Sequence, residues 1–283
     1  MQILLALLAA TFYGSADFLG GLATRRSSVL PVMIFSQLAG LTTLLFVLPV
    51  LPAATATSRD FAWGAMAGGA LGIGLMLLYQ GLATGKMSVV APVTAVLAVV
   101  VSAAGGILIG DRLSVSAFAG VALAITAIML ISQDGAPKKS TGGRGWAAAQ
   151  GFAPALSAGV LIGVFFTAFK QTDPASGLLP LVPARLASLI AVGAVGLSRR
   201  QAFRVGPDAV WLIVFAGALD IFANMFYVLA TRQGMLTIAA TLTSLYPAST
   251  ILLARFVLGE RLHRIQIAGL ACAGLGVVLI GAG

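Results

Sequence analysis

Long apolar runs separated by short polar turns cover almost the whole chain. Each run is close to the ~20 residues that an α-helix needs to cross the roughly 30 Å hydrocarbon core of a bilayer. The pattern therefore predicts an all-α membrane protein with ten transmembrane helices. The expected spans are residues 2–23, 29–51, 61–83, 87–109, 114–132, 146–169, 178–197, 209–231, 236–258 and 262–281.

Composition agrees with a chain that has lipid as its main solvent. Hydrophobic residues make up 59% of the sequence and charged residues only 9%, and the mean hydropathy is +1.04. A soluble domain carries roughly 25% charged residues. We therefore expect a multi-pass protein of the plasma membrane, the inner membrane of a bacterium, in contact with membrane lipid.

The sequence contains one pattern written twice, with the copies 149 positions apart. The turn Gly110-Asp111-Arg112-Leu113 of the first copy corresponds to Gly259-Glu260-Arg261-Leu262 of the second. The same offset pairs Ala91 with Ala240, Thr94 with Thr243, Gly120 with Gly269, Ala122 with Ala271 and Ile131 with Ile280. We expect five spans in residues 1–133 and five in 146–283, joined by a cytoplasmic linker, 134–145. Because five is odd, the second half would enter the membrane from the opposite side, and such inverted repeats are typical of transporters.

Lysine and arginine are distributed unequally between the two sets of loops. One set, with the adjacent helix ends, carries Arg25, Arg26, Lys86, Lys138, Lys139, Arg144, Arg199, Arg200, Arg204, Arg255, Arg261 and Arg264. The other set carries Arg59, Arg112, Lys170 and Arg232. The positive-inside rule makes the first set cytoplasmic and predicts that both termini face outward. Because the basic residues are scattered over short loops and form no patch with aromatic residues, we do not expect nucleic-acid binding.

Several short motifs resemble the EamA-type repeat of the drug/metabolite transporter superfamily. They are Tyr13-Gly14-Ser15, Pro183-Ala184-Arg185, Tyr246-Pro247, Gly259-Glu260-Arg261-Leu262 and Ala268-Gly269. The first half departs from the pattern, with Ala98 in the place of Pro247, Asp111 in that of Glu260 and Ser36 in that of Arg185. The resemblance implies ten spans and secondary transport of small organic solutes, often export of amino acids or metabolites. Among compact bacterial members, the chain is similar to exporters of aromatic amino acids.

Three charged residues lie well inside predicted spans, away from the span ends, where each costs about 2.5–3.5 kcal/mol on insertion scales and is a functional candidate. They are Asp17, Arg185 and Asp220. Asn224 and Tyr227 follow Asp220 at helical spacing and form one polar stripe with it. The stripe could line a substrate cavity, or it could belong to an interhelical hydrogen-bond network in which Asp220 pairs with Arg185.

Further candidates for a substrate cavity are Tyr13, Gln37, Tyr79 and Tyr246. Tyr79 is the repeat partner of Tyr227, and both could instead be tyrosines of the membrane interface. Pro247 is expected to kink its span, as a gate or as a fixed feature of the bundle.

The depth of Asp17 and Asp220 makes them candidates for proton coupling, with pairing of Asp17 to Arg25 or Arg26 as the alternative. Asp111 and Glu260 are expected to cap the helices that follow them, where the helix dipole favours an acid.

One histidine and one cysteine supply no metal site. We expect no cofactor, and the sequence has no glycine-rich loop for ATP. It also has no Ser/His/Asp set of a hydrolase. We therefore predict a secondary transporter rather than an enzyme, working by alternating access as a monomer or homodimer. It would export aromatic or other neutral amino acids or related small metabolites. The alternatives are a drug-efflux carrier, a membrane enzyme, a lipid-handling protein or a channel.

Overall fold

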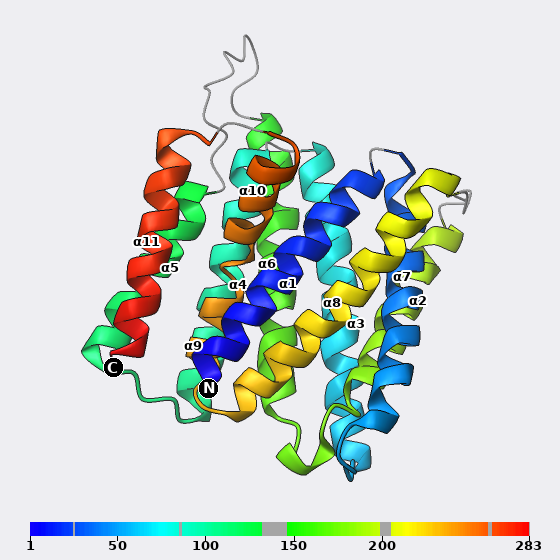
Figure 1. Ribbon diagram of the computed structural model, residues 1–283, viewed down its shortest axis with the longest axis horizontal. Coiled ribbons are helices and arrows are strands. Elements are labelled where there is room, and N and C mark those ends of the chain that lie inside the picture. The colour runs from blue at the N-terminus through cyan, green and yellow to red at the C-terminus, as the bar shows by residue number, and fades with distance from the viewer. Residues whose placement is uncertain (25, 85–86, 132–145, 199–204, 260–261, 283) are drawn as a thin grey trace.

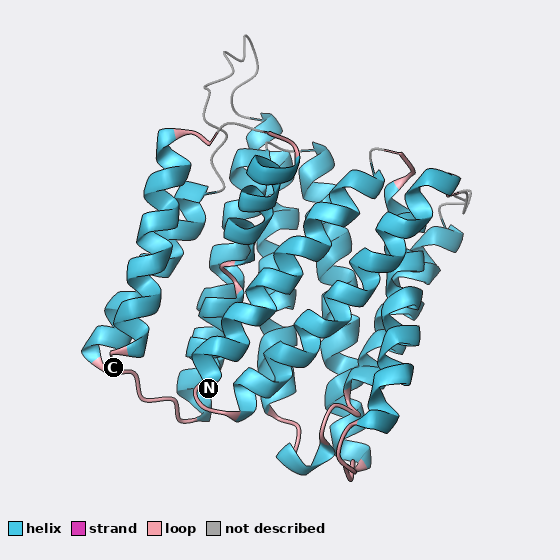
Figure 2. Ribbon diagram, viewed as in Figure 1, coloured by secondary structure: helices cyan, strands magenta, loops and turns pink. Residues whose placement is uncertain are grey.

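The computed structural model describes residues 1–24, 26–84, 87–131, 146–198, 205–259 and 262–282, and in these residues the regular secondary structure is entirely helical (Figure 2). The α-helices are α1 (Gln2–Thr24), α2 (Val29–Val47), α3 (Ser58–Thr84), α4 (Met87–Ile109), α5 (Val115–Ile131), α6 (Trp146–Lys170), α7 (Leu181–Ser198), α8 (Val210–Arg232), α9 (Leu236–Thr243), α10 (Tyr246–Val257) and α11 (Arg264–Gly281). Three short 3₁₀ helices, Leu48–Val50, Pro174–Ser176 and Pro207–Ala209, lie between them.

The helices stand side by side in one bundle, with α5 and α11 packed together at one edge (Figure 1). The start of α1 and the end of α11 lie at the same end of the bundle. Among the residues that the structure describes, seven helical segments are long and apolar enough to cross a membrane, and three shorter apolar helices accompany them: 93–109, 115–131 and 181–197. The fold is therefore that of an all-helical integral membrane protein.

The expected span 236–258 is divided into two helices, α9 and α10. Pro247, in the first turn of α10, has no N–H to donate to the carbonyl of Thr243, so the α-helical ladder is interrupted there. At the break, Leu245 donates its N–H to Leu242 O at 3.2 Å, a tighter turn than an α-helix makes. Every residue of α9 is buried, whereas no residue of α10 is fully buried.

Close approaches of backbone to backbone hold neighbouring helices together, and glycine makes them possible. A Cβ placed on Gly68 of α3 would overlap the carbonyl of Ala184 on α7. A Cβ on Gly217 of α8 would likewise overlap the carbonyl of Ser36 on α2. Helices in lipid associate through such small-residue contacts, because lipid tails provide no hydrophobic drive to bring helices together.

The two halves of the sequence pack on each other in corresponding ways. Helix α1 packs on α8 and α6 on α3, while α2 packs on α8 and α7 on α3. At the bundle edge, a Cβ on Gly120 of α5 would lie 2.7 Å from a side-chain carbon of Ile280 on α11. The corresponding Cβ on Gly269 of α11 would lie 2.8 Å from the matching carbon of Ile131 on α5. Each helix therefore meets the C-terminal end of its partner near its own N-terminal end, so α5 and α11 are antiparallel.

The adjacent glycines of α3 provide a direct test of this packing. We expect Gly68→Ala to lower the free energy of unfolding by about 1–3 kcal/mol, because the methyl group would push α3 away from the backbone of α7. Gly69→Ala is the matched control, since nothing lies within 4 Å of its added Cβ. That control should be neutral or stabilising by up to about 1 kcal/mol, the gain in helix propensity. Thermal unfolding of the two variants in detergent measures the difference, and equal melting temperatures would contradict the packing described.

Candidate functional site

The centre of the candidate site is an ion pair between Arg185 of α7 and Asp220 of α8. It is the one ion pair between side chains of described residues. Arg185 passes beside Gly40 of α2, where an added Cβ would lie 3.7 Å from the guanidinium carbon. The tighter neighbour of Gly40 is the carbonyl oxygen of Gly217 on α8, 2.8 Å from the added Cβ, so α2 meets α8 closely beside the arginine. The arginine side chain is 7% exposed and that of the aspartate 31%, so the positive partner is the more deeply enclosed.

Asn224 holds Asp220 from the next turn of the same helix. Its side-chain nitrogen donates to the main-chain oxygen of Asp220 at 2.7 Å and to a carboxylate oxygen at 3.4 Å. Asn224 is itself buried. The spacing of four residues that placed both side chains on one helical face thus produces a direct contact, and the amide N–H groups of Asn224 are directed to Asp220.

Three further polar groups from the first half of the chain surround the ion pair. Helix α1 packs on α8 and places Tyr13 within electrostatic range of Asp220, Arg185 and Asp17. Asp17, one turn further on, lies within range of Asp220. Gln37 lies three residues before Gly40 on α2, and therefore on the face of that helix that meets Arg185.

Two of these groups present atoms without a hydrogen-bond partner. The hydroxyl of Tyr13 and the side-chain oxygen of Gln37 are both buried and unpartnered, and Gln37 is only 6% exposed. Buried polar atoms normally have a partner, so each such atom requires an explanation.

Asp17 is the third group, and its charge is not balanced within the part of the chain that the structure describes. The side chain is exposed. It does not pair with Arg26, whose guanidinium donates to the main-chain oxygen of Asp208 at 3.3 Å. Arg25 lies outside the described residues.

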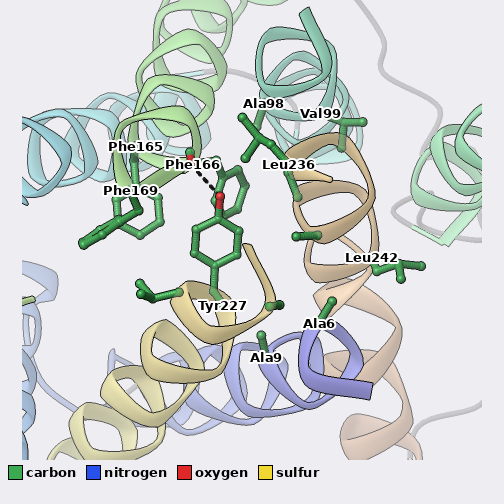
Figure 3. Close-up of a cluster of buried hydrophobic side chains, with 14 of the residues drawn as sticks. Ala6, Ala9, Ala98, Val99, Phe165, Phe166, Phe169, Tyr227, Leu236 and Leu242 are labelled. Carbon is green, nitrogen blue, oxygen red and sulfur yellow. Dashed lines mark hydrogen bonds between the residues drawn. The ribbon is translucent and has the colours of Figure 1, made fainter. Parts of the chain in front are cut away.

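Tyr227 lies outside this group of side chains. Its ring is fully buried against Phe165 and Phe166 of α6, and its hydroxyl donates to the carbonyl of Phe166 at 2.6 Å (Figure 3). The stripe of Asp220, Asn224 and Tyr227 is thus divided between two environments. Its first two members contact each other beside Arg185, and its last packs in an aromatic cluster.

The remaining candidates lie at helix crossings or beyond the described side chains. Tyr246 and Pro247 begin α10, where α1 crosses it at Gly14. The hydroxyl of Thr250 donates to the carbonyls of Gly14 at 3.1 Å and Tyr246 at 3.2 Å. Tyr79 belongs to α3, but its side chain is outside the described part of the structure.

One polar contact that the sequence did not reveal joins the two halves at the start of α9. The carboxylate of Asp111 accepts from the N–H of Thr237 at 2.8 Å and from its hydroxyl at 2.9 Å. Asp111 therefore caps α9 of the other half, and the expectation that it caps α5 is wrong. Helix α5 has its own cap in Ser114, which accepts the N–H of Ala117 at 3.1 Å. Glu260, the repeat partner of Asp111, is not among the described residues.

The same end of α9 has two further anchors. Lys170 donates to the carbonyls of Thr231 and Gly234, both at 2.6 Å. Gln2 donates to Met235 O at 2.6 Å. Nothing in the sequence pattern singled out Gln2 or Lys170, because their partners are main-chain oxygens more than 60 positions away.

The model of the EamA-like transporter family matches residues 1–133 and again residues 150–282. The chain belongs to the EamA-like transporter family. The resemblance drawn from the motifs is therefore confirmed, and the protein is a membrane transporter of the drug/metabolite type.

Other comparisons add the fold but no substrate. No curated protein matches the chain. A solved crystal structure matches the chain with a TM-score of 0.80 and 14% sequence identity. The match covers 99% of this chain and 98% of the other. At that identity the likeness shows a shared fold across the whole length of this EamA-family member.

The unequal burial of the ion pair predicts unequal effects of removing its partners. Asp220→Leu leaves the enclosed Arg185 without a counter-charge and should destabilise the protein by about 2–4 kcal/mol. Arg185→Met leaves Asp220, which is partly exposed and can be solvated, so the loss should be smaller. The double variant should lose less than the sum of the single losses, because the two residues interact directly. Thermal unfolding of all three in detergent gives the coupling, and strictly additive losses would contradict a direct ion pair.

Proposed function

We propose that this EamA-family transporter is a secondary carrier that crosses the inner membrane ten times and exports amino acids or related small metabolites by alternating access. The observation that carries the proposal is the polar group around Arg185 and Asp220. It gathers side chains from α1, α2, α7 and α8, and Asp220 stands about midway along its helix. Ionisable groups at such a depth mark substrate or ion pathways in membrane proteins.

An inverted repeat explains the packing of the two halves. Gly120 of the first half is equivalent to Gly269 of the second, and Ile131 is equivalent to Ile280. Gly120 contacts Ile280 and Gly269 contacts Ile131, so the two contacts are the same contact with the halves interchanged. A two-fold axis lying across the helices relates such antiparallel contacts, and in a bilayer that axis lies in the membrane plane. Helix α1 is equivalent to α6, and α3 is equivalent to α8. The packing of α1 on α8 therefore corresponds to that of α6 on α3, which supports the same two-fold rotation. The proposed units are residues 1–133 and 146–283, with 134–145 as the cytoplasmic linker.

Proton coupling is proposed at Asp17, with Asp220 as its neighbour. Arg185 balances the charge of Asp220, whereas the carboxylate of Asp17 stands near Asp220 without a cation of its own. Two carboxylates at close range in a medium of low dielectric favour the uptake of a proton by one of them. Asp17 is the better acceptor, because Asp220 is held in its ion pair and by Asn224.

Uptake into proteoliposomes tests the carrier proposal. A panel of labelled amino acids and the amines derived from them, with empty liposomes as the control, should reveal a solute whose uptake saturates with concentration. A pore would give uptake that rises linearly with concentration. Absence of saturable uptake for every member of the panel would contradict the proposed substrate class.

Asp17→Asn tests the proton proposal. We expect the variant to lose the stimulation of uptake by a pH gradient while keeping exchange of labelled for unlabelled solute, which needs no net proton movement. Asp208→Asn is the control, since Asp208 is exposed in the 3₁₀ helix Pro207–Ala209, twelve residues before Asp220. If the pH gradient still accelerates uptake by Asp17→Asn as much as by the parent protein, the assignment to Asp17 is wrong.

Single-cysteine labelling tests the proposed topology. In a Cys272→Ala background, Arg59→Cys should react with a membrane-impermeant maleimide added to intact cells. Ser28→Cys should react only after the cells are permeabilised. Both positions are exposed in the structure, and α2 separates them: Ser28 precedes its first residue, and Arg59 lies in the first turn of α3, which follows it. The reverse pattern would overturn the prediction that the termini face outward.

A further inference from the structure

Three buried hydroxyl groups lie close together in sequence at the end of α9, where the span is broken. They belong to Thr241, Thr243 and Ser244, which are 0%, 0% and 1% exposed, and none has a hydrogen-bond partner among the described residues. A buried hydroxyl elsewhere in the bundle donates to the carbonyl one turn back, as Ser102 of α4 does to Ala98 O at 2.8 Å. Because buried polar atoms normally have a partner, the three hydroxyls at the break require another one.

The same break leaves main-chain oxygens beside these hydroxyls without their helical donors. In an unbroken helix Thr241 O would accept the N–H of Leu245, but that N–H donates to Leu242 O at 3.2 Å. Thr243 O would accept from position 247, and Pro247 has no N–H to donate. Two carbonyl oxygens are therefore released from the helical ladder at the point where the hydroxyls lie.

One face of α9 carries two of the hydroxyls to the contact with the first half of the chain. Thr241 and Ser244 are three residues apart and share that face. Thr237 precedes them on it, and its hydroxyl lies 3.4 Å from Ala103 O of α4, the helix on which α9 packs. The end of α9 lies roughly 12 Å along the axis from its first residue, deep within a hydrocarbon core of about 30 Å. The hydroxyls therefore stand inside the bundle, between the two halves.

This set of oxygen atoms has the chemistry of a site for a monovalent cation. Hydroxyl and carbonyl oxygens are hard, uncharged ligands, and the C-terminal end of a helix adds partial negative charge. Mg²⁺ and Ca²⁺ are bound mainly through carboxylates, and residues 236–257 contain no aspartate or glutamate. In transporters, the ends of broken helices at the interface between repeats coordinate Na⁺.

We propose that the break between α9 and α10 binds a sodium ion, at the contact between the two halves of the chain. The hydroxyls of Thr241 and Ser244 and the main-chain oxygens of Thr241 and Thr243 are its ligands. The ion gives these buried oxygens the partner that they otherwise lack, and it stabilises the broken span. This inference goes beyond the proposed carrier function, and it is tested on the purified protein without transport.

The equivalent position in the first half provides a matched control. Thr94 of α4 corresponds to Thr243 and is as deeply buried, at 1% exposed. Its hydroxyl already donates to Ala155 O at 3.1 Å. Ala98 stands in the place of Pro247, and α4 continues through it. The first half therefore differs both in the break and in the bonding of the hydroxyl.

Melting temperatures of the full-length protein in detergent test the proposal. NaCl should raise the melting temperature saturably, by about 2–6 °C, relative to choline chloride at the same ionic strength, because an ion that binds only the folded protein stabilises it. Labelled sodium should bind the protein saturably, and unlabelled sodium but not choline should displace it.

Two variants tie the binding to the named hydroxyls. Thr241→Val and Ser244→Ala should each weaken sodium binding about tenfold or more, the scale of a contact with a charged group. Without sodium, each should melt at or above the temperature of the parent protein, because the hydroxyl that it loses has no partner there. Thr94→Val should melt at a lower temperature, since it loses the bond to Ala155 O, but should keep the sodium response.

Each contrary outcome overturns a stated part of the proposal. Equal melting temperatures in NaCl and choline chloride, with no saturable binding of labelled sodium, overturn the sodium site. Unchanged sodium binding in folded Thr241→Val and Ser244→Ala overturns its location at the break. Loss of sodium binding in folded Thr94→Val overturns that location too, because the loss would not depend on the proposed ligands. The carrier proposal stands or falls separately, by the uptake measurements.

Discussion

The structure depends on close contact between helix backbones in a solvent that provides no hydrophobic drive for helix association. At Gly68 and Ala184, and again at Gly217 and Ser36, a glycine allows one helix to touch the carbonyls of another. These contacts fix α7 against α3 and α8 against α2. Helix α2 also packs on α7, and the long side chain of Arg185 passes Gly40 of α2 to reach Asp220 on α8. The ion pair is a consequence of how closely the backbones pack.

That ion pair in turn determines which charges are available to a solute. A buried arginine with a close carboxylate partner offers no net charge, and Asn224 holds the carboxylate in place. The excess charge of the site is carried by Asp17. A carrier that moves an uncompensated charge through the hydrocarbon region pays a desolvation penalty, so each crossing favours a state in which Asp17 is neutralised. In the proposed mechanism, a proton bound to Asp17 achieves this.

The sequence predicts the helices and the family well, because both depend on local pattern. Apolar length indicates where the helices lie, and the 149-residue offset indicates equivalent positions such as Gly120 and Gly269. The partners of side chains are harder to predict from the sequence, because helical spacing shows which residues share a face but not which helix that face contacts. Tyr227 shares a face with Asp220 yet meets the aromatic side chains of α6. Asp111 has the residue type of a cap but reaches a helix of the other half.

The asymmetry between the halves is concentrated at α9 and α10. Ala98 lies within the uninterrupted helix α4, whereas Pro247, at the equivalent position, separates two short helices. Side chains from elsewhere in the chain anchor the start of α9: Asp111 caps it, and Gln2 and Lys170 hold the turn before it. Helix α10 lies beyond the break, is less buried, and crosses α1 at Gly14, next to Tyr13 and about one turn before Asp17. The break at Pro247 therefore separates a helix that is anchored by side chains from elsewhere in the chain from one that packs on α1.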